Sequence, residues 1–476
     1  MTWKELIESE KKFDPGQLSS FLNSTITSTL QTEYYTKPDD QAKIIFNAHQ
    51  LMMDANREIY ALSLLLPIND IHKQLIIYNL LKNGRGVSKE QKFWENRIIM
   101  VALKLMPTNR AYKLFTVLQK NKVNNVRARW LAKEFLTSRE NLVYETIKYK
   151  KWLKNLIIHN HLKPEKSNKE IFSFLFEKKP KVETGLLKLA LEAKKDKEAV
   201  FKLPYSIALG YKALHKIPDE EFYEKIKGQM TKAEKLRAQE VAGKAGVKIE
   251  TRFETYAPIK LLKYFRLAVE KADYKIFEKA CKKTADKIPF SFGKVAIVLD
   301  NSPSMYGSFE KKFHPISVAE SVTEVMKNLA EVKVYSTSGK DITKAFLTKL
   351  EGSSDLATAL LKSLKDNPEL IIIISDGYEN SPAGLAHQIL QAYLIKVLGK
   401  TMILHINPVY APETKDIKTL HDKILTMGIR DTRQLMLILL IALAHFKKTK
   451  EIQKLLKELR KKVEVPAPKK KRKVKK

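Results

Sequence analysis

The sequence predicts a multidomain chain with two fold classes: an all-α array of paired helices, followed by an open α/β sheet with mostly parallel strands. Up to about residue 287, apolar residues recur at three- and four-residue spacing, as on amphipathic helices. After Pro289, short and wholly apolar runs alternate with helical segments, which is typical of strands covered on both faces. With 476 residues, 44% of them hydrophobic, the chain is long enough for several packed cores.

The helical part is broken at short turn signals, such as Pro67–Asn69, Asn83–Gly86 and Pro107–Asn109. About twelve helices joined by such turns favour a stack of helical hairpins. No clean sequence period is visible, so the repeats are expected to be degenerate. The segment from Gly228 to Ile249 has a weak apolar stripe, and we expect an exposed helix and a loop there.

The α/β part is expected to contain strands at 294–300, 332–337, 370–376 and 401–408, with helices between them and a closing helix at 432–446. In open parallel sheets the ligand site lies beyond the carboxyl ends of the strands, where the strand order reverses. The residues after the first and third of these strands are therefore the first candidates for a site.

The composition limits the class of protein. A single cysteine, Cys281, excludes a disulfide scaffold and any zinc site built on several thiolates. The charged first twenty residues do not resemble a signal peptide. The longest apolar stretch, Leu435 to Phe446, has about half the length of a membrane span. We therefore expect an intracellular protein that binds no membrane.

The formal net charge is +34, and it is concentrated locally. Residues 1–290 carry 55 basic and 34 acidic side chains, and the stretch from Val101 to Asn160 alone carries 13 basic and 3 acidic ones. Clustered positive charge on a folded surface is the main sequence-independent source of nucleic-acid affinity. A lysine-rich solvated surface without a nucleic-acid partner is the alternative.

Carboxylates and hydroxyls follow two of the expected strands. Asp300, Ser302 and Ser304 form a D-x-S-x-S pattern after the first strand, and Asp376 follows the third. Ser354 lies in the loop between them, where a helix begins. Oxygen ligands of this kind suit hard cations such as Mg²⁺. The alternative is that Asp300 and Ser302 only form turns and helix caps.

This arrangement resembles the metal-ion-dependent adhesion site of von Willebrand factor A domains. The resemblance implies that Mg²⁺ or another divalent cation is bound by Asp300, Ser302 and Ser304, and by Asp376 directly or through water. The family's threonine in the middle loop is replaced here by Ser354, which keeps the hydroxyl. A haloacid-dehalogenase phosphatase is disfavoured because its second aspartate is replaced by Ser302. A two-metal nuclease would need Asp355 or Glu379 as a further ligand.

A helical array that precedes an A domain resembles the Ro autoantigen family, whose TROVE module is a ring of helical, HEAT-like repeats. The stretches Ile147–Lys150 and Asn160–Pro164, the basic helix Asn124–Leu136 and the sequence ETYAPIKLLKYF are similar to segments of that module. The resemblance implies a helical-repeat domain at 1–288 and a von Willebrand factor A-like domain at 289–462.

The resemblance also implies a non-enzymatic, monomeric RNA-binding protein of RNA quality control. Its partners would be small structured noncoding RNA and single-stranded 3′ ends of misfolded RNA, with a possible protein partner at the A domain. The implied RNA-binding residues are Arg127, Arg129, Lys133, Lys148, Lys150, Lys151, His161 and Lys163. A magnesium-dependent protein-interaction adaptor in a ribonucleoprotein, with an incidental basic surface, is the alternative.

Three residues of the basic segment have structural alternatives. His161 can serve only to end the preceding helix. Trp130 and Trp152 lie at helical spacing, and core packing is the simpler expectation for both.

Residues 463–476 form a basic tail that we expect to be disordered. Pro468–Val474, PKKKRKV, is identical to a well-known viral nuclear-import signal, and the tail is either native or appended. The protein is expected to be cytoplasmic, or nuclear if this signal is native and read.

Overall fold

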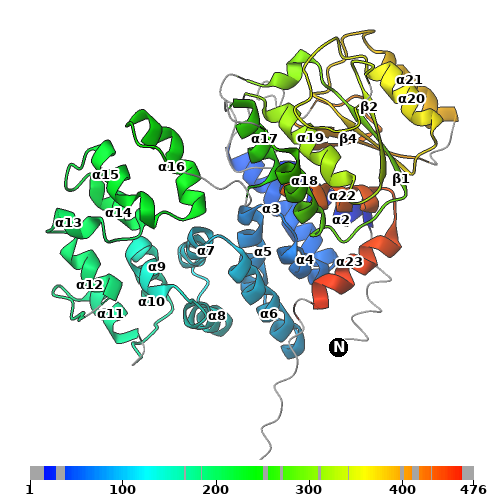
Figure 1. Cartoon of the computed structure of the whole chain (residues 1–476). Coiled ribbons are helices and arrows are strands. Elements are labelled where there is room, and N and C mark those ends of the chain that lie inside the picture. Colours follow the sequence, from blue (N-terminus) through cyan, green and yellow to red (C-terminus); the bar gives the residue numbers. More distant parts are fainter. Residues whose placement is uncertain are drawn as a thin grey trace, which may run out of the picture. The chain divides into compact units, whose positions relative to one another are not determined.

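A computed structural model of the chain divides into two compact units, which are described separately (Figure 1). The sheet unit contains Met1–His72 and Phe253–Lys476, and the helical unit contains Lys73–Arg252. The residues that the structure describes are 15–27, 38–165, 168–183, 185–249, 256–267, 272–308, 312–340, 342–396, 401–409, 418–429, 431–461 and 463.

The helical unit consists of short helices joined by turns of a few residues, as the spacing of apolar residues predicts. Helix α5 (Asp70–Lys82) spans the boundary between the two units at His72 and leads into the helical unit. The elements that follow are α6 (Lys89–Leu105), α7 (Thr108–Lys120), α8 (Val126–Thr137), α9 (Leu142–Lys148), α10 (Lys150–His159), α11 (Lys169–Phe176), α12 (Gly185–Glu192), α13 (Lys197–Val200), α14 (Tyr205–Lys212), α15 (Asp219–Ile226), η4 (Lys227–Gln229) and α16 (Lys232–Lys244).

Side-chain caps fix several of these helix starts. The Ser88 hydroxyl accepts the Gln91 N–H at the start of α6, and the Asn125 side chain accepts the Ala128 N–H at the start of α8. Such caps satisfy main-chain donors that have no partner inside the helix. Helix α16 begins with a capping box and lies within the segment where an exposed helix is expected.

The sheet unit is built on five parallel strands in the order β2-β1-β3-β4-β5. Their bounds are β1 (Lys294–Leu299), β2 (Glu331–Ser336), β3 (Leu370–Ile374), β4 (Met402–Asn407) and β5 (Leu425–Gly428). Leu299 of β1 is in register with Ser336 of β2 and with Ile374 of β3. The order 2-1-3-4-5 reverses between β1 and β3, so the crevice beyond these two strand ends is the switch point of the sheet.

Helices cover both faces of this sheet. On one face, α20 (Leu356–Lys365) and α21 (Leu385–Lys396) pack on alternate residues of β1 and β3, including Val298 and Ile373 (Figure 1). Helix α19 (His314–Met326) and the largely apolar α22 (Leu435–His445) are mostly buried in the same unit. Residues Val295 to Leu299 are all buried, which explains why β1 reads as a continuous apolar run.

Helices from both ends of the chain complete the sheet unit. The Ser19 hydroxyl of α2 (Pro15–Thr27) donates to the Ile441 carbonyl, and Arg460 of α23 (Thr449–Lys461) pairs with Glu58 of α4 (Arg57–Leu62). The bounds of the further elements are α3 (Pro38–Ala55), η2 (Ser63–Leu65), α17 (Pro258–Leu267), α18 (Tyr274–Ala285), η6 (Pro303–Tyr306) and η8 (Thr432–Gln434).

The predicted fold class is confirmed: helical repeats are followed by an α/β sheet of the A-domain type. Strand β5 and helix α23 were not expected from the sequence. The boundaries of the compact units lie at residues 72 and 252, whereas the change from helical to α/β structure comes after residue 288. The domain bounds 1–288 and 289–462 therefore stay a prediction. In the described ranges, no helix is long and apolar enough to cross a membrane.

Candidate functional sites

The first candidate site lies at the switch point of the sheet unit. The N–H of Asp300, the residue after β1, donates to the Ile374 carbonyl at the end of β3, at 3.0 Å. Asp376 follows two residues after Ile374, and its negative charge helps to raise the pKa of the Asp300 carboxyl. The structure therefore brings together the two carboxylates that the sequence placed at neighbouring strand ends.

The D-x-S-x-S residues form a tight loop around one oxygen of Asp300. The Ser302 N–H donates to Asp300 Oδ1 at 2.9 Å, and the hydroxyls of Ser302 and Ser304 are 2.9 Å apart. The 3₁₀ turn η6 starts at Pro303, whose fixed φ suits the first position of a helical turn. The backbone thus aims both serine hydroxyls and the carboxylate at one place.

Two oxygens at this site are buried without a hydrogen-bond partner among the described residues: Asp300 Oδ2 and Ser354 Oγ. Both side chains are fully buried. Burial raises the pKa of Asp300 to about 6, and the charge of Asp376 adds to this shift, whereas the hydrogen bonds from Ser302 oppose it. Buried polar atoms are normally satisfied, so this pair fits a bound cation.

Ser354 is held near the D-x-S-x-S loop by main-chain contacts. The Glu351 N–H donates to the Asn301 carbonyl at 3.0 Å, and the Asn301 side-chain amide donates to the Lys349 carbonyl at 3.1 Å. These bonds tie the segment that leads to Ser354 to the residue next to Asp300. The structure therefore places the loop that carries Ser354 beside the D-x-S-x-S loop, and the role of the Ser354 hydroxyl stays a prediction.

Asp376 is positioned by the glycine that follows it. Gly377 has φ +83°, and a Cβ there would lie 2.8 Å from the Lys418 carbonyl oxygen. The Asn407 amide bridges the carbonyls of Asp376 and Lys418, at 3.0 and 3.1 Å. A side chain at residue 377 would force this loop apart and move Asp376.

Asp355 and Glu379, the further acids that a nuclease would need, accept hydrogen bonds from main-chain N–H groups. Asp355 Oδ1 accepts the Thr358 N–H at the start of α20, at 2.9 Å, and Glu379 Oε1 accepts the Ala386 N–H at 2.6 Å. Within the described ranges, no group of three or more His, Cys, Asp or Glu side chains could hold a metal ion. A cation here would depend on two carboxylates and several hydroxyls.

The second candidate site is a pocket of about 500 Å³ in the helical unit. Three predicted RNA-binding residues, Lys133, His161 and Lys163, line it. Lys133 pairs with Glu165 at 3.0 Å, with both side chains about half exposed. The rest of the lining consists of apolar side chains together with four polar or charged ones: Leu136, Leu142, Val143, Leu153, Ile157, Leu162, Ile171 and Phe172, and Thr137, Arg139, Glu140 and Asn168.

His161 has both a structural and a surface role. Its φ is +53°, its N–H donates to the Ile158 carbonyl, and the Leu162 N–H donates to the Ile157 carbonyl at 3.0 Å. This is a Schellman motif that ends α10, with His161 in its left-handed position. The main chain supplies the cap, so the exposed imidazole is left at the pocket.

Lys148, Lys150 and Lys151 are exposed where α9 passes into α10. The Lys148 ammonium donates to the Tyr144 hydroxyl at 2.9 Å, and the Lys150 ammonium lies 4.7 Å from the ring centroid of Phe174. Burial, together with the nearby ammonium groups of Lys194 and Lys154, lowers the pKa of Lys150. The surface is thus dense in positive charge.

Arg127 and Arg129 differ although they are two residues apart on α8. The Arg127 guanidinium pairs with the buried Glu95 at 2.9 Å and donates to Asn96 and to the Leu80 carbonyl. Arg129 is exposed. Arg127 therefore has a structural role, and of the two only Arg129 is available at the surface.

The two tryptophans are only partly in the core. Trp130 is 42% exposed, so core packing does not account for it. Trp152 is half-buried and stacks on Tyr149, with ring centroids 5.7 Å apart.

The comparison with solved structures decides the fold. The chain is similar to the crystal structure of the Deinococcus radiodurans Ro (RSR) protein, with a TM-score of 0.53 and 12% sequence identity. The match covers 90% of this chain and 99% of the Deinococcus protein. The chain has the Ro fold. No protein-family model matches the sequence, and no curated protein matches it either.

The structure adds one residue, which was missed from the sequence, to the candidate metal site. The Thr337 hydroxyl, one residue beyond β2, lies 3.3 Å from Asp300 Oδ1 and 3.1 Å from Asn301 Oδ1. The signal was present, because Thr337 ends an expected strand whose carboxyl end lies at the same edge of the sheet. The basic tail of this Ro-fold chain, with PKKKRKV, lies outside the described residues.

Proposed function

We propose that this protein is a non-enzymatic RNA-binding protein of the Ro family that scaffolds small structured noncoding RNAs and binds the 3′ ends of misfolded RNA. It acts as a monomer in the cytoplasm, or in the nucleus if the basic tail is read as an import signal. The observation that carries the proposal is the pocket of the helical unit, which collects Lys133, His161 and Lys163 on one surface.

The surface has the two components that RNA recognition needs. Exposed lysines supply contacts to phosphates, which give affinity without sequence preference. The apolar pocket, with an imidazole at its rim, offers a place for an unpaired base, which proteins read by stacking and hydrogen bonds. A purely solvated lysine surface does not need such a pocket.

The test is a charge reversal on the helical unit of the full-length protein. Lys148→Glu, Lys150→Glu and Lys151→Glu together should weaken binding of a hairpin RNA with a single-stranded 3′ end by at least about tenfold. The slope of log K against log salt should fall by up to about 3. The matched control reverses Lys202, Lys216 and Lys248, which are also exposed. Equal losses in both triple variants would show that only net charge matters.

The sheet unit has a second role in this proposal, as a module that binds a divalent cation and a protein partner. Mg²⁺ would be held by Asp300, Ser302, Ser304, Ser354 and Asp376. When bound, it supplies an open coordination position for an acidic group of the partner. The unpartnered Asp300 Oδ2 supports this role, and it also supports the alternative, an adaptor whose basic surface is incidental.

No catalytic role is proposed for the acids of the sheet unit. Asp355 and Glu379, the further ligands that a two-metal nuclease would use, already accept main-chain hydrogen bonds. Incubation of the protein with labelled RNA and Mg²⁺ tests this directly, since release of shorter RNA fragments that is lost in Asp300→Asn would indicate a nuclease.

A further inference from the structure

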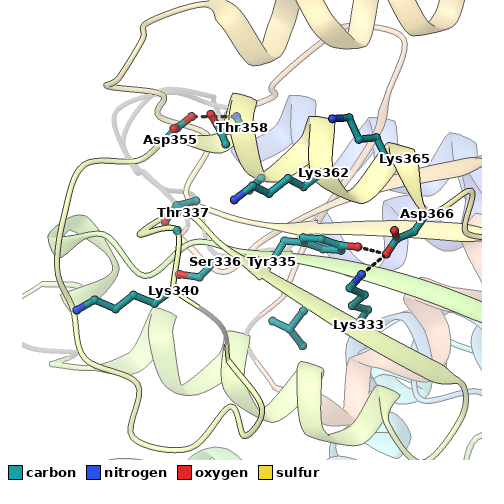
Figure 2. Close-up of a pocket in the computed structure, with 13 residues that line it drawn as sticks. Lys333, Tyr335, Ser336, Thr337, Lys340, Asp355, Thr358, Lys362, Lys365 and Asp366 are labelled. Carbon is teal, nitrogen blue, oxygen red and sulfur yellow. Dashed lines mark hydrogen bonds and ion pairs between the residues drawn. The ribbon is translucent and has the colours of Figure 1, made fainter.

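A groove of about 330 Å³ runs beside the outer edge of β2, the edge strand of the sheet unit (Figure 2). Lys333 and Tyr335 of β2 line one side, and Thr358 and Lys362 of α20 line the other. We call it the edge groove.

The main chain of β2 presents free hydrogen-bonding groups to this edge. The N–H groups of Glu331 and Thr337 donate to Gly293 and Leu299, on the β1 side. Because residues alternate along a strand, the N–H and C=O groups of Val332 and Val334 point away from β1. Among the described residues, β2 pairs with β1 alone. An extended peptide could therefore add to this edge as a further strand.

The groove carries a net positive charge, because four lysines and two aspartates line it, and both aspartates are already engaged. Asp366 pairs with Lys333 at 2.7 Å and accepts from the Tyr335 hydroxyl, and Asp355 caps α20. The remaining lysines that line the groove are Lys340, Lys362 and Lys365. Lys340 pairs with Glu351, whereas Lys362 and Lys365 are exposed on the last turns of α20 (Figure 2).

We propose that the edge groove binds an acidic, extended segment of a partner protein, which pairs with β2 and places its carboxylates on Lys362 and Lys365. The main-chain pattern of Val332 and Val334 favours a peptide over an RNA, because it matches the amides of a strand rather than phosphates. Edge lysines also protect sheets from aggregation, but that role does not require a groove.

The edge groove ends beside the candidate metal site. Thr337 lines the groove, and its hydroxyl lies 3.3 Å from Asp300 Oδ1. One end of a segment on β2 would therefore lie close to the proposed cation. The inference deepens the partner-binding role proposed above for the sheet unit and rests on it, but pairing with β2 does not itself need the cation.

The probe is a displayed library of random short peptides, selected on the full-length protein in the presence of Mg²⁺. Enriched peptides are expected to be acidic and to bind Lys362→Glu/Lys365→Glu at least about tenfold more weakly than the parent protein. The matched control is Lys282→Glu/Lys283→Glu, which reverses two exposed lysines of α18 in the same unit. Equal loss in the control, or enrichment of peptides without acidic residues, would overturn the proposal.

Strand addition has a separate test in Val334→Pro. Proline removes only an outward N–H, so the β1 pairing should survive while peptide binding is lost, and Val334→Ala should keep binding. Selected peptides that bind Val334→Pro as tightly as Val334→Ala would contradict pairing with β2. Mg²⁺ binding is measured separately in the same variants, because the metal site and the edge groove are tested independently. If the protein binds no Mg²⁺, the proposed metal site is wrong, but the peptide result for the edge groove still stands. Single-stranded RNA is then tested as a competitor of the selected peptides. If RNA displaces the peptides, and Lys362→Glu/Lys365→Glu abolishes RNA binding, the groove would be assigned to RNA instead.

Discussion

The Ser302 N–H donates to one oxygen of the Asp300 carboxylate at 2.9 Å, while the other oxygen, Oδ2, is buried without a partner among the described residues. Protein interiors rarely leave such an atom unsatisfied. Removing its charge should therefore have opposite effects on metal binding and on the stability of the metal-free protein.

We predict that Asp300→Asn abolishes Mg²⁺ binding in calorimetric titration. Without metal, the variant should be more stable than the parent protein by about 1–2 kcal/mol, because an unsatisfied buried charge close to Asp376 is gone. Asp286→Asn, an exposed change in the same unit, is the control for both measurements. Mg²⁺ binding that persists in Asp300→Asn would place the cation elsewhere.

Substitutions of Arg127 and Arg129 should have different effects, one on the stability of the fold and the other on RNA binding. Arg127→Met removes the guanidinium that pairs with the buried Glu95 and donates to the Leu80 carbonyl, so the free energy of unfolding in urea should fall by about 3 kcal/mol. Arg129→Met should change stability by less than about 0.5 kcal/mol and should weaken RNA binding. If the two variants lose equal stability, the structural assignment of Arg127 is wrong.

His161→Asn tests whether the imidazole or only the turn matters. Asparagine tolerates the left-handed conformation that φ +53° requires, so the Schellman motif and the stability should be kept. RNA affinity, measured by filter binding, should nevertheless fall several-fold because the imidazole at the pocket is lost. An affinity equal to that of the parent protein would reduce His161 to a turn residue.

His49 should make the sheet unit sensitive to acid. Its ring nitrogens lie 2.8 Å from the Tyr60 hydroxyl and 2.8 Å from His72 Nδ1, and burial, with the charge of His72, lowers its pKa to about 3. The unfolded chain binds this proton at the ordinary pKa of 6.5. The contribution of neutral, buried His49 to the free energy of unfolding is therefore complete above pH 6.5 and is lost as the pH falls towards 3.

Thermal unfolding measured across this window gives the test. Well below the unfolded pKa, the contribution of one such histidine to the free energy of unfolding falls by about 1.4 kcal/mol per pH unit. His49→Gln keeps a polar group between Tyr60 and His72 but does not titrate, so its pH dependence should be shallower. An identical slope in the variant would assign the acid sensitivity to other groups.

Much of the fold could be predicted because both parts follow simple apolar patterns. Strand β5 was missed because four residues ending in Met427 and Gly428 carry little β signal. Helix α23 is strongly amphipathic, so a helical signal was present in the sequence beyond the expected closing helix. The grouping of α2 with α22 depends on contacts such as Ser19 with Ile441, more than 400 residues apart, which no local pattern encodes.

The grouping of Asp300 with Asp376 was easier to predict than the surroundings of the basic residues. Asp300 and Asp376 follow strands, and the rule for parallel sheets places strand ends together. The basic residues lie on helices, where charge alone does not distinguish a surface cation such as Arg129 from one that pairs with a buried acid, such as Arg127. The pocket beside His161 depends on how α8 to α11 pack, which the sequence alone does not show.

The most direct test of the central claim is ultraviolet crosslinking of a bound hairpin RNA to the full-length protein, followed by mass spectrometry of the crosslinked peptides. The account predicts crosslinks within residues 124–136 and 147–163, around the pocket lined by Lys133, His161 and Lys163. Crosslinks confined to the basic tail at 464–476, or to the sheet unit, would contradict it.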